Sequence, residues 1–307
     1  MARSVQIAVS AAMADAVLSH LDGIHGILGT ARQTNASLSP PGDIVVIQTT
    51  NEAVRDVLAR LAELGVPKQG TILTSELKSI VCPTHQKSIE NESNETAWEE
   101  MAVMLRQETN IDGNYIALTF FAGAIAAIGL WADKIHVVIG AMVIAPAFEP
   151  LLRIPFGLIS GLSRMASNGL RSSLAGYAMM LLGGAITLLI LRVIDSGAAA
   201  GSGLESRSWA QYWSTFTPPG VLASIIGAAA GAFVVSGLRS VLTTGVMITL
   251  SLVPSITLVG MAIASGDMTL AAKAFVRWSV DVLLVLLMSA VVLGAKQKLV
   301  HRRRALG

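Results

Sequence analysis

The chain has 307 residues, of which 53% are hydrophobic and only 14% charged, and its mean hydropathy is +0.63. Soluble globular domains carry about 25% charged residues, so this composition excludes a single soluble globule. The charge is unevenly distributed, with a net −3 over residues 1–95 and a net +5 over residues 96–307. We therefore expect a small soluble domain followed by a polytopic α-helical membrane domain. One cysteine and the absence of a signal-peptide pattern argue against a disulfide scaffold or a secreted enzyme, and no nucleic-acid partner is expected.

Residues 1–80 have the pattern of a small α+β domain. Apolar residues alternate where a strand is expected and recur every three or four residues where a helix is expected. In chain order the pattern predicts strand, helix, strand, strand, helix and strand, over residues 5–9, 13–21, 27–34, 44–47, 51–64 and 70–77. This β-α-β-β-α-β order is typical of the ferredoxin-like fold, which hosts many unrelated functions and so does not name one.

Two short groups in this part of the chain have ligand types that zinc uses. His20, Asp22 and His25 lie close together in sequence, and Cys82 and His85 have a Cys-x-x-His spacing. A zinc site needs four ligands and neither group supplies more than three, so we expect no metal and no cofactor. Residues 81–96 are rich in Ser, Asn and Glu, which predicts a linker.

The rest of the chain is organised as membrane helices. Residues 97–114 are expected to form an interfacial helix, with Trp98, Met101, Ala102 and Leu105 in one apolar stripe. The transmembrane domain covers residues 115–295 and a basic tail covers residues 296–307. Apolar stretches close to the length of about 20 residues that a span needs predict six spans, at residues 115–131, 136–161, 169–192, 220–238, 241–264 and 270–294.

Basic residues in the connections orient these spans. One set of connections and the tail hold eight Lys and Arg residues: Arg164, Arg171, Arg239, Lys296, Lys298, Arg302, Arg303 and Arg304. The opposite connections hold three: Lys134, Arg207 and Lys273. The positive-inside rule then places the N-terminal domain and the tail in the cytoplasm, with the protein in the plasma (inner) membrane.

An internal repeat is visible across the predicted spans. The pattern Gly140-x-Met142-x-Ile144 in the second span returns as Gly245-x-Met247-Ile248 in the fifth. Both are followed by a proline interruption: Pro146, Pro150 and Pro254. Two three-span halves joined in series must have opposite topology. Inverted repeats with interrupted helices at matching positions indicate a transporter whose site lies near the membrane midplane.

Four charged residues lie within the predicted spans, where each costs at least about 2.5–3.5 kcal/mol. Glu149 and Arg153 lie four residues apart in the second span, and Arg277 and Asp281 lie four apart in the sixth. At this spacing opposite charges can meet on one helical face. One hypothesis is that Glu149 and Asp281 converge on a central site beside carbonyl groups freed by the prolines, and carry a cation or proton. In this hypothesis Arg153 and Arg277 hold the two acids or contact an anionic substrate. The alternative is two structural ion pairs that fix helix packing.

Several motifs resemble a known family. Ala97-Trp98-Glu99-Glu100, Arg106-Gln107-Glu108-Thr109, the run Ile139 to Pro146 and Leu252-Val253-Pro254 are similar to the domain of unknown function 389 family, over about residues 97–295. The resemblance implies a polytopic bacterial or archaeal membrane protein without an agreed substrate. Family members tend to have Gly at the position of Glu149 and Asn at that of Asp281, so the interrupted backbone would be the shared feature.

These observations predict a transporter or channel for a small ion or solute, with the N-terminal domain as a regulatory module. The expected partners are the lipid bilayer and the transported species, and small-residue helix faces also allow contacts with a second copy. A sensor whose soluble domain binds a ligand and whose spans only anchor it is the alternative. An enzyme is not expected, because the His-Glu-x-x-His and Gly-x-Ser-x-Gly motifs are missing from the sequence.

Overall fold

The computed structural model describes residues 2–77, 98–194, 203–237 and 250–301, and the chain divides into two compact units near residue 101. The N-terminal unit contains β1 (Arg3–Val9), α1 (Ala11–Leu21), β2 (Ile27–Leu38), β3 (Pro41–Thr49), α2 (Asn51–Glu63), the short α3 (Val66–Gln69) and β4 (Thr71–Glu76). These elements follow the order expected from the sequence, with α3 added between α2 and β4.

The four strands form one antiparallel sheet in the order β2-β3-β1-β4. Every second residue of the central strands points to one face, as the period of two requires. On that face Val5, Ile7 and Ile47 are fully buried and pack with Val17 of α1 and Leu61 of α2. The two amphipathic helices therefore supply the other half of the core, and the predicted groups His20/Asp22/His25 lie outside it.

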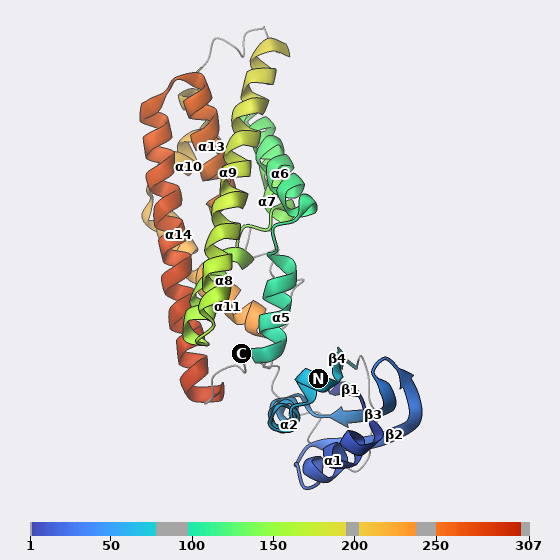
Figure 1. The fold of residues 1–307 in the computed structure, drawn as a ribbon. Coiled ribbons are helices and arrows are strands. Elements are labelled where there is room, and N and C mark those ends of the chain that lie inside the picture. The colour runs from blue at the N-terminus through green and yellow to red at the C-terminus, as the bar shows by residue number, and fades with distance from the viewer. Residues whose placement is uncertain (1, 78–97, 195–202, 238–249, 302–307) are drawn as a thin grey trace. The chain divides into compact units, whose positions relative to one another are not determined.

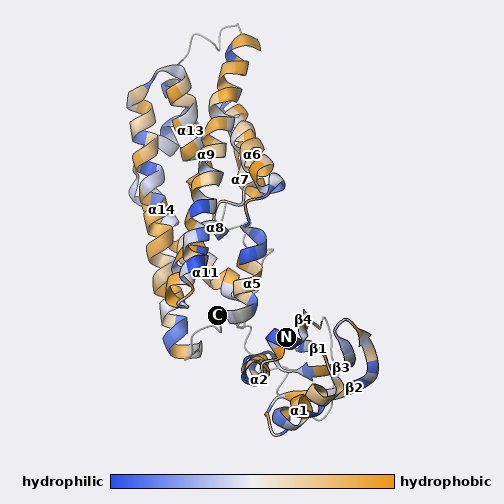
Figure 2. Ribbon diagram, in the orientation of Figure 1, coloured by the Kyte–Doolittle hydropathy of each residue, from blue (hydrophilic) through white to orange (hydrophobic). Residues whose placement is uncertain are grey.

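The second unit is helical (Figure 1). It contains α5 (Trp98–Glu108), α6 (Gly113–Trp131), α7 (Ile135–Ile144), α8 (Glu149–Ile159), α9 (Ser163–Ile194), η1 (Leu204–Ser206), α10 (Ser208–Ser214), α11 (Pro218–Ser236), α13 (Leu252–Ser265), α14 (Met268–Lys296) and η2 (Gln297–His301); α5 crosses the boundary between the units. Hydrophobic residues predominate along α6, α9, α13 and α14 (Figure 2).

Among the described residues, four helices are long and apolar enough to cross a membrane: α6, α9, α11 and α14. The pair α7 and α8 makes a fifth candidate span if it counts as one span, bent by 41° at its break. The predicted span 241–264 lies partly outside the described residues. Its described part contains α13, which has 14 residues and is too short to span alone.

Small residues set the closest helix contacts in this unit. A Cβ on Gly123 of α6 would lie 2.1 Å from the Met180 carbonyl oxygen of α9, and one on Gly260 of α13 would lie 2.1 Å from the Leu181 carbonyl oxygen. These glycines let backbones approach where any side chain would collide, the way small residues pack membrane helices. Helix α9 therefore holds α6 on one side and α13 on another.

The helices of the second unit repeat in length and spacing. Helices α6 and α11 both have 19 residues, and α11 begins and ends 105 residues after α6, at 218 and 236 against 113 and 131. The candidate spans Ser163–Ile194 and Met268–Leu299 both have 32 residues and are displaced by the same 105. In Figure 1, α9 and α14 run in opposite directions.

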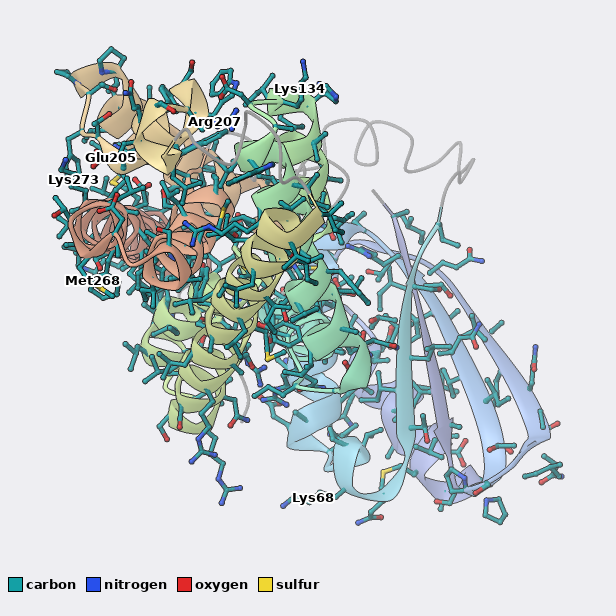
Figure 3. All side chains as sticks on the ribbon, turned by 90° about the horizontal axis from the view of Figure 1, so that it is seen from above. Lys68, Lys134, Glu205, Arg207, Met268 and Lys273 are labelled. Carbon is teal, nitrogen blue, oxygen red and sulfur yellow. The ribbon has the colours of Figure 1, made fainter. Side chains whose placement is uncertain are left out.

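Two connections meet at one end of the helical unit. The backbone N–H of Trp209 donates to Asp133 Oδ1 (3.1 Å), and the Arg207 guanidinium lies 5.4 Å from the centre of the Trp131 ring. Figure 3 views this end, with Lys134, Glu205, Arg207 and Lys273 labelled. The connections predicted to lie on one membrane side, between spans one and two and between spans three and four, are thus in contact.

Candidate functional site

The break between α7 and α8 follows directly from its prolines. Pro146 has no N–H, so the Met142 carbonyl loses its helical partner, and the Ala147 N–H donates instead to the Ala145 carbonyl (2.8 Å). Pro150 lies in the first turn of α8, where the missing N–H costs nothing. The prolines therefore end one helix, free backbone carbonyls and start the next helix at Glu149.

A cavity of about 390 Å³ lies beside this break. Its walls come from the last turns of α5, the first turns of α6, the α7–α8 break and one residue of α11. Polar side chains face it from α5, α6 and their connection, and the carbonyl-bearing backbone of the break forms another part of the wall. The lining residues are Met104, Gln107, Glu108, Asn110, Asp112, Asn114, Tyr115, Leu118, Val143, Ile144, Ala145, Pro146, Glu149 and Val235.

Glu149 is the acidic group at the inner part of this cavity. Its Oε2 atom is buried and has no hydrogen-bond partner, while the backbone N–H groups of Phe148 and Glu149 at the start of α8 lie against the carboxyl group. A buried carboxylate oxygen without a partner is costly unless a proton or a cation neutralises it. Glu108 lines the same cavity, and its negative charge repels a negative charge on Glu149.

The expected ion pair between Glu149 and Arg153 is not among the contacts of the described residues. Arg153 is 2% exposed, and its Nη1 donates to Thr109 Oγ1 (2.6 Å) at the end of α5, with the Thr109 carbonyl 3.5 Å away. The four-residue spacing permits the pair, but the Thr109 backbone and hydroxyl compete for the guanidinium. Glu149 is left facing the cavity instead.

The second predicted pair does form. Arg277 Nε lies 3.2 Å from Asp281 Oδ2, and both side chains are buried in α14. Ser224 of α11 donates to Asp281 Oδ1 (2.8 Å), and Arg277 Nη2 donates to Ser251, just before α13 (3.3 Å). The Arg277 guanidinium also lies 5.6 Å from the centre of the Phe216 ring. This group of Ser224, Ser251, Arg277 and Asp281 joins three segments through one ion pair.

The structure therefore places the predicted site residues in two groups. The first group is at the cavity: Pro146 and Glu149 line it, Pro150 directly follows Glu149, and Arg153 bonds to Thr109. The second group contains Arg277 and Asp281 of α14. Pro254 is buried in the first turn of α13, and residues 238–249 before this helix lie outside the described residues. Within the described residues, no hydrogen bond or ion pair links Glu149 to Asp281.

Tyr177 of α9 lies between the two groups. Its hydroxyl donates to the Ala147 carbonyl in the α7–α8 break (2.8 Å), and its ring meets the Trp278 ring edge-on, with centres 5.1 Å apart. Trp278 directly follows Arg277 in α14. Tyr177 was not among the predicted site residues, although a tyrosine inside an apolar span signals a hydroxyl that needs a buried partner.

Other residues of the cavity were also missed by sequence reasoning. Glu108 was noted only as part of a motif in the predicted interfacial helix, and residue 115 only as the start of the first predicted span. Asp112 Oδ1 caps α6 by accepting from the Tyr115 N–H (2.7 Å), and the Tyr115 hydroxyl donates to the Ser172 carbonyl (2.7 Å). Sequence spacing alone contains no signal that α5 faces the break.

The histidine and cysteine groups of the sequence have no metal-binding arrangement in the part of the chain that the structure describes. The described residues contain no group of three or more His, Cys, Asp or Glu side chains placed to hold a metal ion. The His20 ring Nδ1 lies 2.9 Å from the Ala16 carbonyl of its own helix. Cys82 and His85 lie outside the described residues.

Comparison with known proteins agrees with the resemblance inferred from the sequence. Residues 142–287 match the family described as Domain of unknown function (DUF389). The match is shorter than the span of about 97–295 expected from the motifs. The uncharacterised protein MJ0678 of Methanocaldococcus jannaschii is 19% identical over 271 residues, which cover 88% of this chain and 80% of that protein. No solved structure matches the chain.

Proposed function

We propose that this protein is a membrane transporter or channel for a small ion, and that the cavity beside the α7–α8 break binds a cation. The observation that carries the proposal is the Glu149 carboxylate, which lines the cavity with a buried Oε2 atom that has no hydrogen-bond partner. Charged groups at membrane depth that lack a structural partner are a mark of ion pathways. Arg153, its nearest expected partner, is engaged by Thr109.

The donor atoms of the cavity favour a hard cation. Carboxylate oxygens of Glu108 and Glu149, amide oxygens of Asn110 and Asn114, and backbone carbonyls of the break are all oxygen ligands. Oxygen ligands suit Na⁺, K⁺, Mg²⁺ and Ca²⁺, whereas zinc and copper prefer nitrogen and sulfur. A proton on Glu149 is the other species that would neutralise this carboxylate.

Two inverted halves of three spans each are part of the proposal. The shared displacement of 105 residues, the opposite directions of α9 and α14 and the proline-containing segments near Pro146, Pro150 and Pro254 support it. In such transporters the two halves rock around a site at interrupted helices. The proposal counts residues 241–264 as the fifth of six spans, so that both termini lie on one side, which the basic residues favour as the cytoplasmic side.

The N-terminal unit is proposed to be a cytoplasmic ferredoxin-like regulatory domain. The strand order β2-β3-β1-β4 with the element order β-α-β-β-α-β supports this fold assignment. The fold alone does not indicate a ligand, so the regulatory role rests on its position in the same chain as the membrane unit.

The test is cation-dependent thermal unfolding of the full chain in detergent or nanodiscs. Na⁺, K⁺, Mg²⁺ and Ca²⁺ are compared with N-methylglucamine at constant ionic strength and at several pH values. A cation at 100 times its Kd stabilises the folded state by about 2.7 kcal/mol. We expect one cation, or a fall in pH, to raise the unfolding temperature of the wild type, and Glu149→Gln to abolish this response.

Glu205→Gln is the matched control, because Glu205 is an exposed acid at the other end of the helical unit. It removes the same charge and should keep the wild-type response. Flux of the stabilising ion into proteoliposomes then separates a carrier or channel from a static binding site. A wild type without any cation or pH response, or a response that Glu149→Gln retains, contradicts the proposal.

A further inference from the structure

The mouth of the cavity is ringed by exposed polar side chains. Gln107, Glu108, Asn110, Asp112 and Asn114 are exposed and line the cavity, while Tyr115 and the Glu149 Oε2 atom are buried farther in. Two of these five exposed polar residues are acidic and none is basic. Lined in this way, the mouth concentrates cations, since clefts with one sign of charge focus the field.

The last turn of α5 is fixed by a buried hydrogen-bond network. Thr109, directly after Glu108, is 0% exposed. Its carbonyl accepts from Ser172 Oγ of α9 (2.6 Å), its hydroxyl donates to the Leu105 carbonyl (2.6 Å), and Arg153 Nη1 of α8 donates to Thr109 Oγ1 (2.6 Å). A guanidinium at a helix C-terminus also interacts favourably with the helix dipole.

This network connects the two carboxylates of the cavity. Arg153 lies one helical turn after Glu149 on α8, and Thr109 is the neighbour of Glu108. The bond between Arg153 and Thr109 therefore fixes the end of α5 against α8, with Glu108 and Glu149 lining the same cavity.

We infer that Glu108 is the outer carboxylate of the cation site, that it takes cations from solution before Glu149 binds them, and that the Arg153–Thr109 contact positions it. The inference rests on the proposed function of this cavity. It assigns Arg153 to positioning, in place of the substrate contact that the sequence suggested. The ligand class is a small cation that oxygen atoms coordinate.

The first experiment measures the cation concentration that gives half of the maximal stabilisation, for the full chain with the ion that stabilises the wild type. Glu108→Gln should raise this concentration at least about threefold, because one attracting charge is lost, while Glu149→Gln abolishes the response. Thr109→Val removes the hydroxyl at nearly constant size and should raise the half-saturating cation concentration by a similar factor. The double variant Glu108→Gln with Thr109→Val should have a half-saturating concentration close to that of Glu108→Gln alone.

Two further variants separate positioning from folding. Arg153→Lys keeps the charge and should retain a response closer to the wild type than Arg153→Gln does. Glu205→Gln, the distant acid, should leave the half-saturating concentration unchanged. A Thr109→Val variant that lowers the unfolding temperature without changing the half-saturating concentration indicates a merely structural contact and overturns the positioning role.

A second readout needs no bound ion. Glu108→Cys, in a Cys82→Ser background, should react faster with a cationic than with an anionic methanethiosulfonate reagent, and adding Glu149→Gln should reduce this ratio. Equal rates with both reagents overturn the inference. If the wild type responds to a cation and the Glu108→Gln variant responds identically, the inference is overturned but the proposed function stands. No cation response in the wild type overturns both.

Discussion

At the residue scale, the two acids within the predicted spans, Glu149 and Asp281, differ in how they are neutralised. Asp281 has an arginine at 3.2 Å and a serine hydroxyl at 2.8 Å, whereas the Glu149 Oε2 atom has no hydrogen-bond partner. A cation could bind the Asp281 carboxylate only by displacing Arg277 from it. We therefore expect the two acids to respond differently to substitution, although their sequence settings are alike.

Removing one member of the Arg277–Asp281 pair should be more harmful than neutralising both. Asp281→Asn leaves the Arg277 charge buried without a counter-charge, and breaking such a pair costs about 3–5 kcal/mol. The double variant Arg277→Gln with Asp281→Asn should recover most of this loss, because two neutral amides can bond to each other. Thermal unfolding of the solubilised variants measures both. Equal instability of the single and double variants would contradict a mainly electrostatic role.

In the N-terminal unit, Asp43 predicts a dependence of stability on pH. The backbone N–H of Asn35 (2.9 Å) and the Arg32 guanidinium hold the pKa of the Asp43 carboxyl below its usual value. A group with a lowered folded-state pKa stabilises the fold above its unfolded pKa of about 3.9, and this stabilisation is lost as pH falls through the folded pKa.

The corresponding variant is Asp43→Asn, measured by denaturant unfolding of the N-terminal unit between pH 7 and pH 2. It should be less stable than the wild type at pH 7, and the difference should shrink toward the acid end of the range. Asp22→Asn, at an exposed acid in the same unit, should show no comparable convergence. A constant difference across the whole range would show that the Asp43 charge is not responsible.

At the element scale, the contact between α6 and α9 depends on backbone proximity. A Cβ on Gly123 would lie 2.1 Å from the Met180 carbonyl oxygen, so Gly123→Ala must push the two helices apart. Overpacking of this kind typically costs 1–3 kcal/mol, and we expect a loss of about 3 kcal/mol because the colliding atom is backbone. The readout is the unfolding temperature and the fraction of monodisperse protein in detergent.

The matched control for this contact is Gly140→Ala in α7, where an added Cβ meets nothing within 4 Å. Alanine is the better helix former by about 1 kcal/mol, so this variant should be neutral or slightly stabilising. If both substitutions destabilise equally, the loss comes from the helices in general and the α6–α9 contact has no special role.

At the scale of the whole molecule, the proposed topology predicts which surface positions a reagent can reach. Glu205 and Lys298 are both exposed, the first at the end shown in Figure 3 and the second in the last turn of the candidate span Met268–Leu299. In a Cys82→Ser background, Glu205→Cys should react with a membrane-impermeant thiol reagent in intact cells. Lys298→Cys should react only after the membrane is permeabilised.

Labelling of both positions in intact cells would contradict the six-span arrangement, because an even number of spans returns the chain to the cytoplasmic side. Labelling of Lys298→Cys alone would reverse the orientation and remove the basis for a cytoplasmic N-terminal domain. The single native cysteine makes the background simple to prepare.

The regular elements were largely predictable because each depends on a local pattern. Alternation at Val5, Ile7 and Val9 indicated the first strand, and the prolines 146 and 150 indicated the interruption of the second span, which the structure places between Ile144 and Glu149. Element boundaries differ from the prediction where strand pairing continues into the expected turn. Strand β2, for example, pairs with β3 as far as Leu38, beyond the expected end at residue 34. Both kinds of signal involve neighbours within a few residues of each other.

By itself the sequence determined an α+β part, an apolar helical part and the place where a helix must break, since hydropathy, periodicity and missing N–H groups act over short distances along the chain. Tertiary structure alone decided the partners. Arg153 and Glu149 have ideal spacing for a pair, yet Arg153 bonds to Thr109, which lies 44 residues earlier in the chain. Local spacing makes such a contact available, but the competition between partners is settled only when distant helices pack and exclude water.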